Sequence, residues 1–213
     1  MESLKCMTLN VRALKARAKR ETLNRYLEVN KVHIACFQET YCSAEFEKEF
    51  NKEFNGSVYH SFTDSNHSRG VCILISDDVH YNVISKHCDT EGRMLALNVE
   101  INEKLFTIVS VYCPNREAER IKFMKYMFKW IEENAISMEN VLLGGDFNCS
   151  IYKYDRKHQN ADRSGKFLEQ SVKKYNLVDV WKMFYKDTRC VTYIDPSNRG
   201  HDSRIYFFFI PEV

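Results

Sequence analysis

The stretch VLLGGDFN, residues 141–148, contains the pattern that decides the fold of this chain. Val141 to Leu143 form a short apolar run, which predicts a buried strand. The run leads directly into Gly144-Gly145-Asp146, and because Gly and Asp are common in turns, an ordinary turn would explain this sequence. However, α/β folds collect their site residues at strand ends on one side of a sheet, and Asp146 and Asn148 follow such a strand.

Three other apolar runs end in polar side chains in the same way. These runs and their polar ends are Leu4–Leu9 with Asn10, Ile34–Phe37 with Gln38-Glu39, and Phe106–Tyr112 with Asn115. Taken singly, Asn10 could cap the following helix, Glu39 could be a surface residue, and Tyr112 could end a strand that is stopped by proline. Taken together, the four runs predict polar side chains gathered on one rim.

The rest of the chain alternates strand-like runs with amphipathic helical stretches. Helices are predicted over Lys15–Asn30, over Arg116–Asn134 and around Phe167–Tyr175, and short strands are predicted around Val180, Val191 and Ile205. The centre of the chain is rich in strands that read as antiparallel hairpins. This pattern indicates an α/β fold, a four-layer sandwich of two packed mixed β-sheets flanked by helices, formed by a single domain over residues 1–213.

The composition is ordinary, with 44% hydrophobic and 28% charged residues and a formal net charge of +2. This charge neither demands nor excludes nucleic acid, because a local basic face matters more than the total. The longest apolar run, Ile205–Ile210, is far too short to cross a bilayer, and the first residues do not resemble a signal peptide. The eight cysteines contain no C-x-x-C pair, which favours buried reduced thiols. We therefore expect an intracellular protein without a membrane partner.

The predicted rim has the chemistry of a metal site. Asn10, Glu39, Tyr112 and Asp146 would form a carboxylate site with neutral hydrogen-bonding groups. Two carboxylates with amides, and without a cysteine or histidine cluster, suit Mg²⁺, with Mn²⁺ as an alternative. Such an ion would polarise a phosphoryl oxygen and stabilise the leaving oxygen.

The order of these motifs resembles that of the endonuclease/exonuclease/phosphatase superfamily over essentially the whole chain. The motifs are Thr8-Leu9-Asn10-Val11, Phe37-Gln38-Glu39-Thr40, Val111-Tyr112-Cys113-Pro114-Asn115, Gly145-Asp146-Phe147-Asn148 and Ser203-Arg204-Ile205. They are most similar to the apurinic-like endonuclease domains of LINE-type (non-LTR) retrotransposons. The resemblance implies a Mg²⁺-dependent endonuclease that nicks one strand of double-stranded DNA in the nucleus and leaves a 3′-hydroxyl to prime reverse transcription. It also suggests a reverse transcriptase domain of a parent polypeptide as a partner.

The resemblance further implies a role for each site residue. Glu39 would be the principal metal ligand, assisted by Asn10. Asp146 would orient or deprotonate the attacking water. Asn148 and Tyr112 would donate hydrogen bonds to the scissile phosphate and its developing charge.

Polar and basic side chains in three segments are candidates for contacts with DNA. They are Arg12, Lys15, Asn115, Thr192, Ser203 and Arg204. Arg12 and Lys15 belong to a basic segment just after Asn10, where phosphate contacts would be largely sequence-blind; a solvated helix face explains this segment equally well. The other four lie after Tyr112 or around a hairpin near the C-terminus, which probes the groove beside the cut in domains of this family.

Two features of the family pattern are missing from the sequence. Ser203-Arg204-Ile205 is normally followed by an Asp that orients a catalytic histidine, whereas Tyr206 follows here. The sequence ends at Val213 before the motif that would carry the histidine. We therefore expect the catalytic Asp/His pair to be lost and turnover to be impaired by ~10²–10⁴-fold.

The early end also has a structural consequence. A missing last strand and its connection, of roughly two dozen residues, would leave a sheet edge unpaired beside Ile205–Ile210. Because an exposed apolar edge pairs with other chains, we expect self-association or completion by a partner. Three functions thus stay open: a DNA-nicking endonuclease, an abasic-site repair endonuclease or related phosphodiesterase, and a catalytically dead, truncated copy that acts as a DNA-binding or interaction module.

Overall fold

Two β-sheets form the centre of the protein. The computed structural model describes residues 3–63, 69–156, 163–186, 188–195 and 202–212. The first sheet consists of β1 (Cys6–Asn10), β2 (Ile34–Gln38), β3 (Gly56–Ser61) and β4 (Val71–Ser76), in the spatial order β1-β2-β4-β3. β1 and β2 are parallel and the other pairs are antiparallel. Because β1 and β2 are parallel, the residues that follow both strands emerge at the same end of this sheet.

The second sheet is larger and has the spatial order β5-β6-β7-β8-β10-β9. Its strands are β5 (Tyr81–Cys88), β6 (Met94–Ile101), β7 (Lys104–Tyr112), β8 (Val141–Asp146), β9 (Leu177–Asp179) and β10 (Tyr206–Pro211). β7 and β8 are parallel, and β10 is antiparallel to β8. The last residues of β7 and β8 therefore lie beside the first residue of β10.

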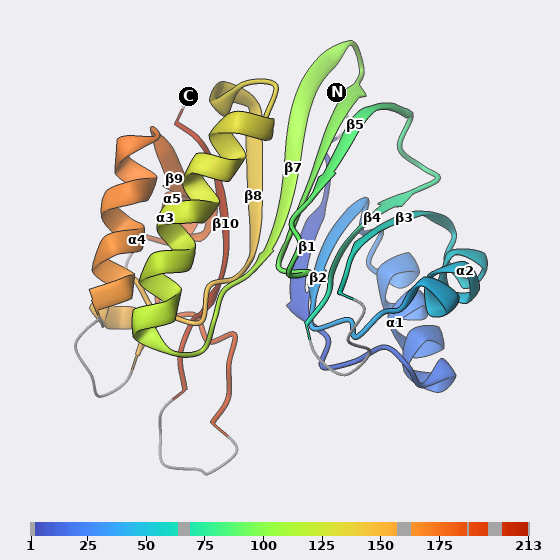
Figure 1. Ribbon diagram of the computed structural model, residues 1–213, viewed down its shortest axis with the longest axis horizontal. Coiled ribbons are helices and arrows are strands. Elements are labelled where there is room, and N and C mark those ends of the chain that lie inside the picture. The colour runs from blue at the N-terminus through green and yellow to red at the C-terminus, as the bar shows by residue number, and fades with distance from the viewer. Residues whose placement is uncertain (1–2, 64–68, 157–162, 187, 196–201, 213) are drawn as a thin grey trace.

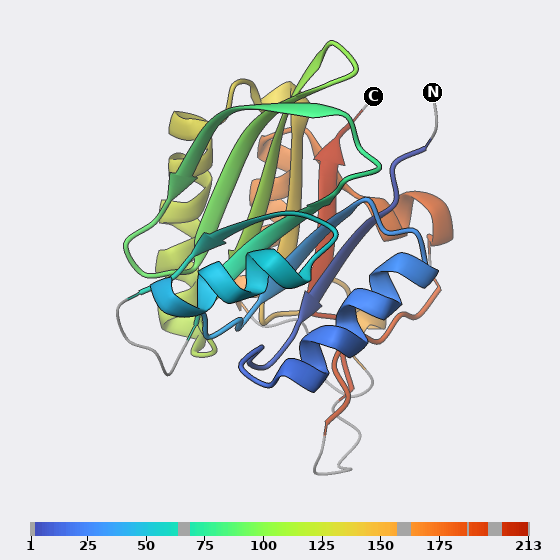
Figure 2. The same cartoon turned by 90° about the vertical axis from the view of Figure 1, so that its right-hand side faces the viewer.

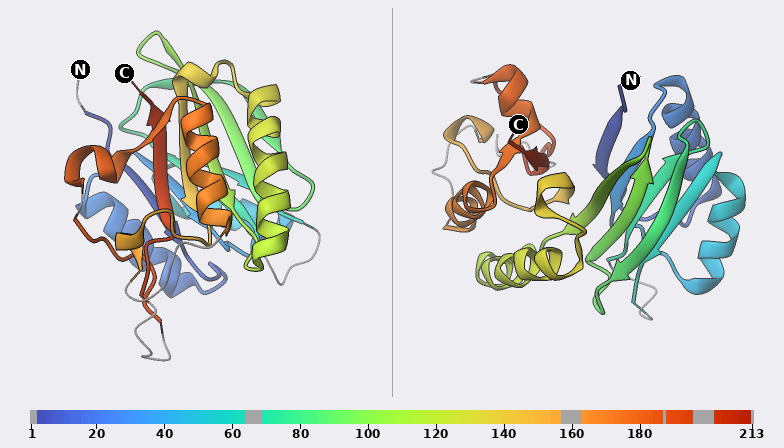
Figure 3. Two further views of the ribbon diagram at one scale, coloured as in Figure 1. Left: turned by 90° about the vertical axis from the view of Figure 1, so that its left-hand side faces the viewer. Right: turned by 90° about the horizontal axis from the view of Figure 1, so that it is seen from above.

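Helices cover the outer face of each sheet (Figures 1 and 2). They are α1 (Arg17–Val29) and α2 (Ala44–Glu53) on the four-stranded sheet, and α3 (Glu117–Asn134), α4 (Arg163–Lys174) and α5 (Val180–Tyr185) on the six-stranded sheet. Two 3₁₀ helices, η1 (Met138–Asn140) and η2 (Lys153–Asp155), flank β8. Figure 3 shows the two sheets facing each other with helices on either side, so the predicted four-layer sandwich is confirmed.

The hydrophobic core has three layers, because successive residues of a strand point to opposite faces of its sheet. On β2, Ile34 and Cys36 face the six-stranded sheet, whereas Ala35 and Phe37 face α1 and α2. On β6, Leu95 and Leu97 face the four-stranded sheet. The third layer lies between the six-stranded sheet and α3 and α4. Apart from the largely exposed edge strand β5, both faces of each sheet are covered, and polar site residues are left to the strand ends.

Gly144 and Gly145 let β8 run through the most crowded part of the larger sheet. A Cβ atom added to Gly144 would collide with the ring of Phe208 on β10, and one added to Gly145 would collide with the carbonyl oxygen of Val111 on β7. The two glycines are therefore required by close packing with both neighbouring strands, and the turn that also explained them from sequence is wrong: both lie within the strand.

Two of the three short strands predicted near the C-terminal end are present in the described structure. The strand predicted around Val180 is β9, which ends at Asp179. Val180 itself begins helix α5, because the side chain of Asp179 accepts a hydrogen bond from Trp181 N at 3.0 Å and so caps the helix. Val191 lies outside the strands, and only Tyr193 beyond it forms an isolated bridge, with Ser203. The third strand, predicted around Ile205, is β10.

The open edge predicted beside Ile205–Ile210 is shorter than expected. β10 pairs with β8 through Tyr206–Phe209 and with β9 through Phe209–Pro211, so every residue of β10 has a neighbour on at least one side and Phe209 has one on both sides. Within the described residues, β1 pairs with β2 alone. Self-association through an open edge stays a prediction.

Two further properties concern the whole described chain. None of its helices combines the length and the apolar character needed to cross a membrane. All eight cysteines are free thiols, and five of them are buried, namely Cys36, Cys42, Cys72, Cys113 and Cys149.

Candidate active site

Four of the predicted site residues meet at one end of the two sheets. Asn10 ends β1, Glu39 follows β2, Tyr112 ends β7 and Asp146 ends β8. These strand ends lie at the lower end of the sandwich in Figure 1. Parallel pairing within each sheet and face-to-face packing between the sheets bring the side chains together, so the site includes residues from both halves of the chain.

A single amide group connects the two sheets at this site. Asn10 Nδ2 donates hydrogen bonds to Glu39 Oε1 at 2.7 Å and to Asp146 Oδ2 at 2.9 Å. Asn10 Oδ1 accepts a hydrogen bond from Arg12 N at 3.1 Å, which fixes the orientation of the amide. The helix cap that also explained Asn10 from sequence does not occur, because α1 begins at Arg17 and its N-cap residue is Ala16.

Glu39 reaches the site because the backbone leaves the strand conformation. The preceding Gln38 faces the six-stranded sheet, where its amide nitrogen lies 3.3 Å from Ser110 Oγ. A regular strand would turn Glu39 to the opposite face, but Glu39 has a φ of 54°. Its carboxylate therefore meets Asn10 on one oxygen and accepts a hydrogen bond from Tyr41 Oη at 3.1 Å on the other.

Asp146 is a buried carboxyl group, with 2% of its surface exposed. Burial raises its pKa to about 6; hydrogen bonds from Asn10 and from the backbone of Asn148 oppose this shift, and the charge of Glu39 adds to it. Asn148 N donates to Asp146 Oδ1 at 2.9 Å. A carboxyl group with a pKa near neutrality is suited to general-base catalysis.

Tyr112 lies against the same pair of carboxylates. Burial raises the pKa of its phenol, and the charge of Glu39 and a hydrogen bond with that side chain raise it further. The guanidinium of Arg93 lies 5.1 Å from the centre of the Tyr112 ring and donates to Tyr112 O at 3.1 Å. The phenol is therefore held in place and stays protonated at neutral pH.

Asn148 and Asn115 are positioned by the loops that follow β8 and β7. Asn148 Nδ2 donates to Cys113 O at 2.7 Å, which ties the two loops together. Buried Arg120 of α3 donates to Pro114 O at 3.1 Å and to Asn115 O at 2.7 Å. The Asn115 side chain is exposed at the rim. The backbone of the loop is therefore fixed, while the Asn115 amide is free to contact a ligand.

Backbone strain is concentrated at this site. Among the described residues, eleven residues other than glycine have positive φ, and five of them lie in the loops of this site, namely Arg12, Ala13, Glu39, Tyr41 and Asn148. Each such conformation costs about 1–3 kcal/mol and persists only when its surroundings enforce it. Here backbone hydrogen bonds from Ala13 N to Glu39 O at 2.7 Å and from Leu14 N to Thr40 O at 3.0 Å hold the two loops against each other. The strained backbone thus lowers stability but fixes the position of these side chains.

The segments predicted to bind DNA differ in exposure. Arg12 and Lys15 are exposed, and Lys19 Nζ donates to Arg12 O at 3.0 Å. Thr192 is half-buried and Ser203 is buried, and the backbone bond from Thr192 N to Ser203 O, at 3.0 Å, closes the base of the predicted hairpin. Residues 196–201, which the predicted hairpin includes, lie outside the described residues.

Arg204 has no surface available for DNA, so that prediction was wrong. Only 2% of its surface is exposed. Its guanidinium donates to Asp155 Oδ1 at 2.9 Å and to both carboxylate oxygens of Asp179. It also lies 4.4 Å from the centre of the Phe207 ring. Arg204 therefore joins η2, β9 and β10 in the interior.

Comparison with known proteins gives the family. The model of the "Endonuclease/Exonuclease/phosphatase family" matches residues 7–203, which include every site residue described above. The chain belongs to this family. The match covers most of the chain and is independent of the geometry of the site.

Relatives of this family member include a transposon protein. A curated protein from Xenopus laevis, "Transposon TX1 uncharacterized 149 kDa protein", is 30% identical over 172 residues, which make up 80% of this chain and 13% of that protein. The chain thus spans only a small part of the length of this relative.

Solved structures of the family share the fold. The endonuclease domain of TRAS1, a telomere-specific non-LTR retrotransposon, superposes with a TM-score of 0.72 at 17% identity, covering 99% of this chain and 86% of that one. An AP endonuclease from Archaeoglobus fulgidus superposes with a TM-score of 0.76 at 19% identity, covering 97% of this chain and 86% of that one. AP endonuclease LMAP from Leishmania major superposes with a TM-score of 0.73 at 16% identity, covering 98% and 79%.

The oxygen donors of this site fit the Mg²⁺ expected for the family. Glu39 supplies a carboxylate and Asn10 a carbonyl oxygen, and Mg²⁺ is usually bound by one or two carboxylates together with water and phosphate oxygens. In the described part of the chain, neither Glu39 nor Asp146 takes part in an ion pair. No group of three or more His, Cys, Asp or Glu side chains converges there either. The donor set therefore suits a hydrated hard cation better than zinc.

The structure adds residues that sequence reasoning missed. Tyr41 donates to Glu39, and Arg93 packs on Tyr112. Tyr41 could have been considered from its position two residues after Glu39. Arg93 carries no such signal, because its partner comes from a neighbouring strand.

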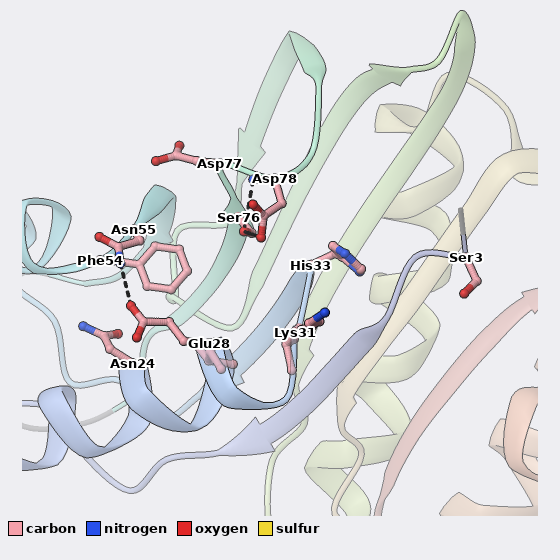
Figure 4. Close-up of a pocket in the computed structure, with 12 residues that line it drawn as sticks. Ser3, Asn24, Glu28, Lys31, His33, Phe54, Asn55, Ser76, Asp77 and Asp78 are labelled. Atoms are coloured by element: carbon pink, nitrogen blue, oxygen red, sulfur yellow. Dashed lines mark hydrogen bonds between the residues drawn. The ribbon is translucent and has the colours of Figure 1, made fainter. Parts of the chain in front are cut away.

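A cavity at the other end of the four-stranded sheet is unrelated to this site. It has a volume of about 910 Å³ and is lined by residues around Lys31 and His33, which precede β2, and by Asp77 and Asp78, which follow β4 (Figure 4). Asn10 and Glu39 lie at the opposite ends of β1 and β2. The large volume of this cavity therefore does not make it the candidate active site.

Proposed function

We propose that this chain is a Mg²⁺-dependent DNA endonuclease that nicks one strand of target DNA for retrotransposon integration. The observation that carries the proposal is the pair of carboxylates, Glu39 and Asp146, bridged by the amide of Asn10 and without an ion pair among the described residues. Two negative charges held close together at the end of the sheets attract a cation, and through it a phosphate. Similarity to the TX1 transposon protein and to the TRAS1 endonuclease domain supports the choice of DNA as substrate.

The metal would be held by Glu39 and by the carbonyl oxygen of Asn10. When bound, Mg²⁺ supplies positive charge that polarises a phosphoryl oxygen and stabilises the leaving oxygen. Mn²⁺ would be accepted as well, because it also prefers oxygen ligands. Tyr41 would keep the Glu39 carboxylate in position through its hydrogen bond.

Asp146 would orient the attacking water and accept its proton. Its burial and its hydrogen bonds from Asn10 and Asn148 N fix the carboxylate. Asn148 has a second amide hydrogen beyond the one donated to Cys113 O, and this hydrogen would bind an oxygen of the scissile phosphate. The hydroxyl of Tyr112 would turn from Glu39 to another oxygen of the same phosphate. Donors fixed in advance stabilise the charge that develops there.

Exposed side chains beside the site would hold the duplex. Arg12 and Lys15 would contact phosphates on one side, and Asn115 would contact the DNA strand on the other. Thr192 and Ser203 would act indirectly, by closing the base of the hairpin beside the cut. Phosphate contacts of this kind give affinity that falls with salt.

We further propose slow turnover, because position 206 carries a phenol in place of a carboxylate. The site of action would be the nucleus, and a reverse transcriptase domain of the same polypeptide would use the 3′-hydroxyl.

Plasmid nicking tests the proposal directly. We expect the chain to convert supercoiled plasmid to the nicked circle in Mg²⁺ but not in EDTA. Glu39→Ala and Asp146→Ala should each reduce the rate by roughly 10²–10⁴-fold, because each removes a metal ligand or the general base. Asp77→Ala, which changes a carboxylate at the opposite end of the sheet, is the matched control and should nick like the wild type.

The outcomes separate the alternatives. Nicking that survives both active-site substitutions would show contamination and refute the assignment of the site. A strong preference for an abasic duplex over intact plasmid would favour a repair endonuclease, in line with the fold shared with AP endonucleases. Duplex binding without nicking would favour a DNA-binding module.

A further inference from the structure

Three neighbouring strands place two tyrosines on either side of Asp146. Tyr112 of β7 is paired in register with Asp146 of β8, and Tyr206 of β10 is paired with Asp146 from the other side. Directly paired residues of adjacent strands have their side chains on the same face of a sheet, with Cβ atoms about 4.5–5.5 Å apart. Tyr112, Asp146 and Tyr206 therefore form one row across the end of the six-stranded sheet.

The face on which this row lies is the one between the two sheets. Phe208, two residues after Tyr206, packs with the inter-sheet core, whereas Phe207 and Phe209 pack on the opposite side. Tyr112 also belongs to the inter-sheet core. The Tyr206 side chain thus points toward the four-stranded sheet, from which Asn10 and Glu39 reach the site.

Tyr206 is accessible from an open groove. This groove, of about 670 Å³, is lined by Asn10, Arg12, Thr192 and Tyr206 at one end and continues along β1 and α1. A ligand that reaches the carboxylates through the groove would pass the Tyr206 ring. The exposed guanidinium of Arg12 lies at the same place, so a negatively charged ligand is favoured.

The strand around Tyr206 is fixed while its hydroxyl is not. Thr192 Oγ1 accepts hydrogen bonds from Ile205 N at 2.9 Å and from Tyr206 N at 3.1 Å. Arg204, two residues earlier, is anchored by its ion pairs with Asp155 and Asp179. Among the described residues, the Tyr206 hydroxyl has no hydrogen-bond partner, so its proton is available to a ligand.

The chemistry of this hydroxyl is that of a neutral donor. A phenol has an ordinary pKa near 10 and is protonated at neutral pH. Burial raises the pKa of Tyr206, the carboxylates of Asp146 and Glu39 and the phenol of Tyr193 raise it further, and Arg12 opposes them. Deprotonation to a nucleophile is thereby disfavoured, whereas donation of a hydrogen bond to an anion is not.

We propose that Tyr206 is a phosphate-binding residue of this site, whose hydroxyl donates a hydrogen bond to a phosphate oxygen of the DNA from the side of Asp146 opposite to Tyr112. The inference rests on the proposed function for its ligand. Two phenols would then hold the phosphate over Asp146, and Tyr206 has a role of its own where the family pattern has a carboxylate.

The test compares Tyr206→Phe with Tyr81→Phe. Both substitutions remove only a hydroxyl, and Tyr81, whose hydroxyl lies 3.0 Å from that of Tyr59, is at the opposite end of the sheets. We expect Tyr206→Phe to reduce the rate of plasmid nicking in Mg²⁺ about 10²- to 10³-fold, as for loss of a preorganised donor. Binding of a short duplex in Ca²⁺, which replaces Mg²⁺ without supporting cleavage, should weaken roughly 3- to 10-fold. Tyr81→Phe should stay within about twofold of the wild type in both assays, since it leaves the site intact.

Each outcome decides a separate question. A Tyr206→Phe variant that nicks and binds like the wild type overturns the role of Tyr206 and leaves the proposed function standing. A wild type that binds the duplex but does not nick overturns the proposed activity, and the binding assay then decides on Tyr206 by itself. A wild type that neither nicks nor binds overturns both.

Discussion

Two pairs of neighbouring carboxylates in this protein differ in the groups that bridge them. Asp155 and Asp179 share the guanidinium of Arg204, which donates three hydrogen bonds to them. Glu39 and Asp146 share only the neutral amide of Asn10. The first pair is complete within the chain, whereas the second retains its negative charge.

The difference separates a structural cluster from a functional one. A buried ion pair in which every partner is satisfied joins its segments firmly, and it leaves no group available to a ligand. Two carboxylates held together without a cation repel each other and are destabilising until a cation binds. The strained backbone around Glu39 and Asn148 belongs to the second cluster, so the chain sacrifices stability where it would bind metal and phosphate.

Breaking the cluster of Arg204, Asp155 and Asp179 should have the largest effect on stability. We expect Arg204→Met to lower the free energy of unfolding by about 3–5 kcal/mol, because two buried carboxylates lose their cation. Urea denaturation monitored by circular dichroism measures the change. Arg20→Met is the matched control: Arg20 is also buried and pairs with Glu53, but 24% of the Glu53 side chain is exposed and water can replace the partner. Equal losses for the two variants would contradict the distinction.

In the cluster of Glu39 and Asp146, removal of a charge should increase stability instead of lowering it. The folded-state pKa of Asp146 is about 6, above its ordinary value of 3.8. Between these two pH values the folded protein holds a proton that the unfolded chain releases, so stability falls as pH rises, by roughly 3 kcal/mol in total. In EDTA, Asp146→Asn should therefore gain stability relative to the wild type as the pH is raised from 4 to 7. A stability difference that does not change with pH would refute the raised pKa.

Binding of Mg²⁺ should change the stability least. We expect Mg²⁺ at about ten times its dissociation constant to stabilise the wild type by about 1.4 kcal/mol, seen as a rise of a few degrees in Tm. Glu39→Gln should lose this shift, whereas Glu21→Gln, a change in an exposed ion pair with Arg17, should keep it. Differential scanning fluorimetry at constant ionic strength makes the comparison. A shift of the same size in Glu39→Gln would place the cation elsewhere.

The sequence predicted the fold and the gathering of Asn10, Glu39, Tyr112 and Asp146. This was feasible because apolar runs mark buried strands, and polar residues directly after such runs lie at one end of a sheet. It could not predict how Glu39 reaches the site, since strand alternation turns this residue away and only the positive φ brings it back. It also could not show that Asp146 and Glu39 share a single amide donor, because the two carboxylates belong to different sheets.

Arg204 and Tyr206 show where sequence reasoning stops. A basic residue beside a predicted hairpin resembles a DNA contact, but Asp155 and Asp179, far apart in the chain, enclose Arg204 in the interior. By itself, the sequence marked Tyr206 only as a departure from the family pattern. The tertiary structure decided which way its side chain points, because the register of β10 on β8 pairs it with Asp146. The order and type of motifs are local properties and can be read along the chain, whereas burial, register and the sharing of charges depend on which distant segments meet.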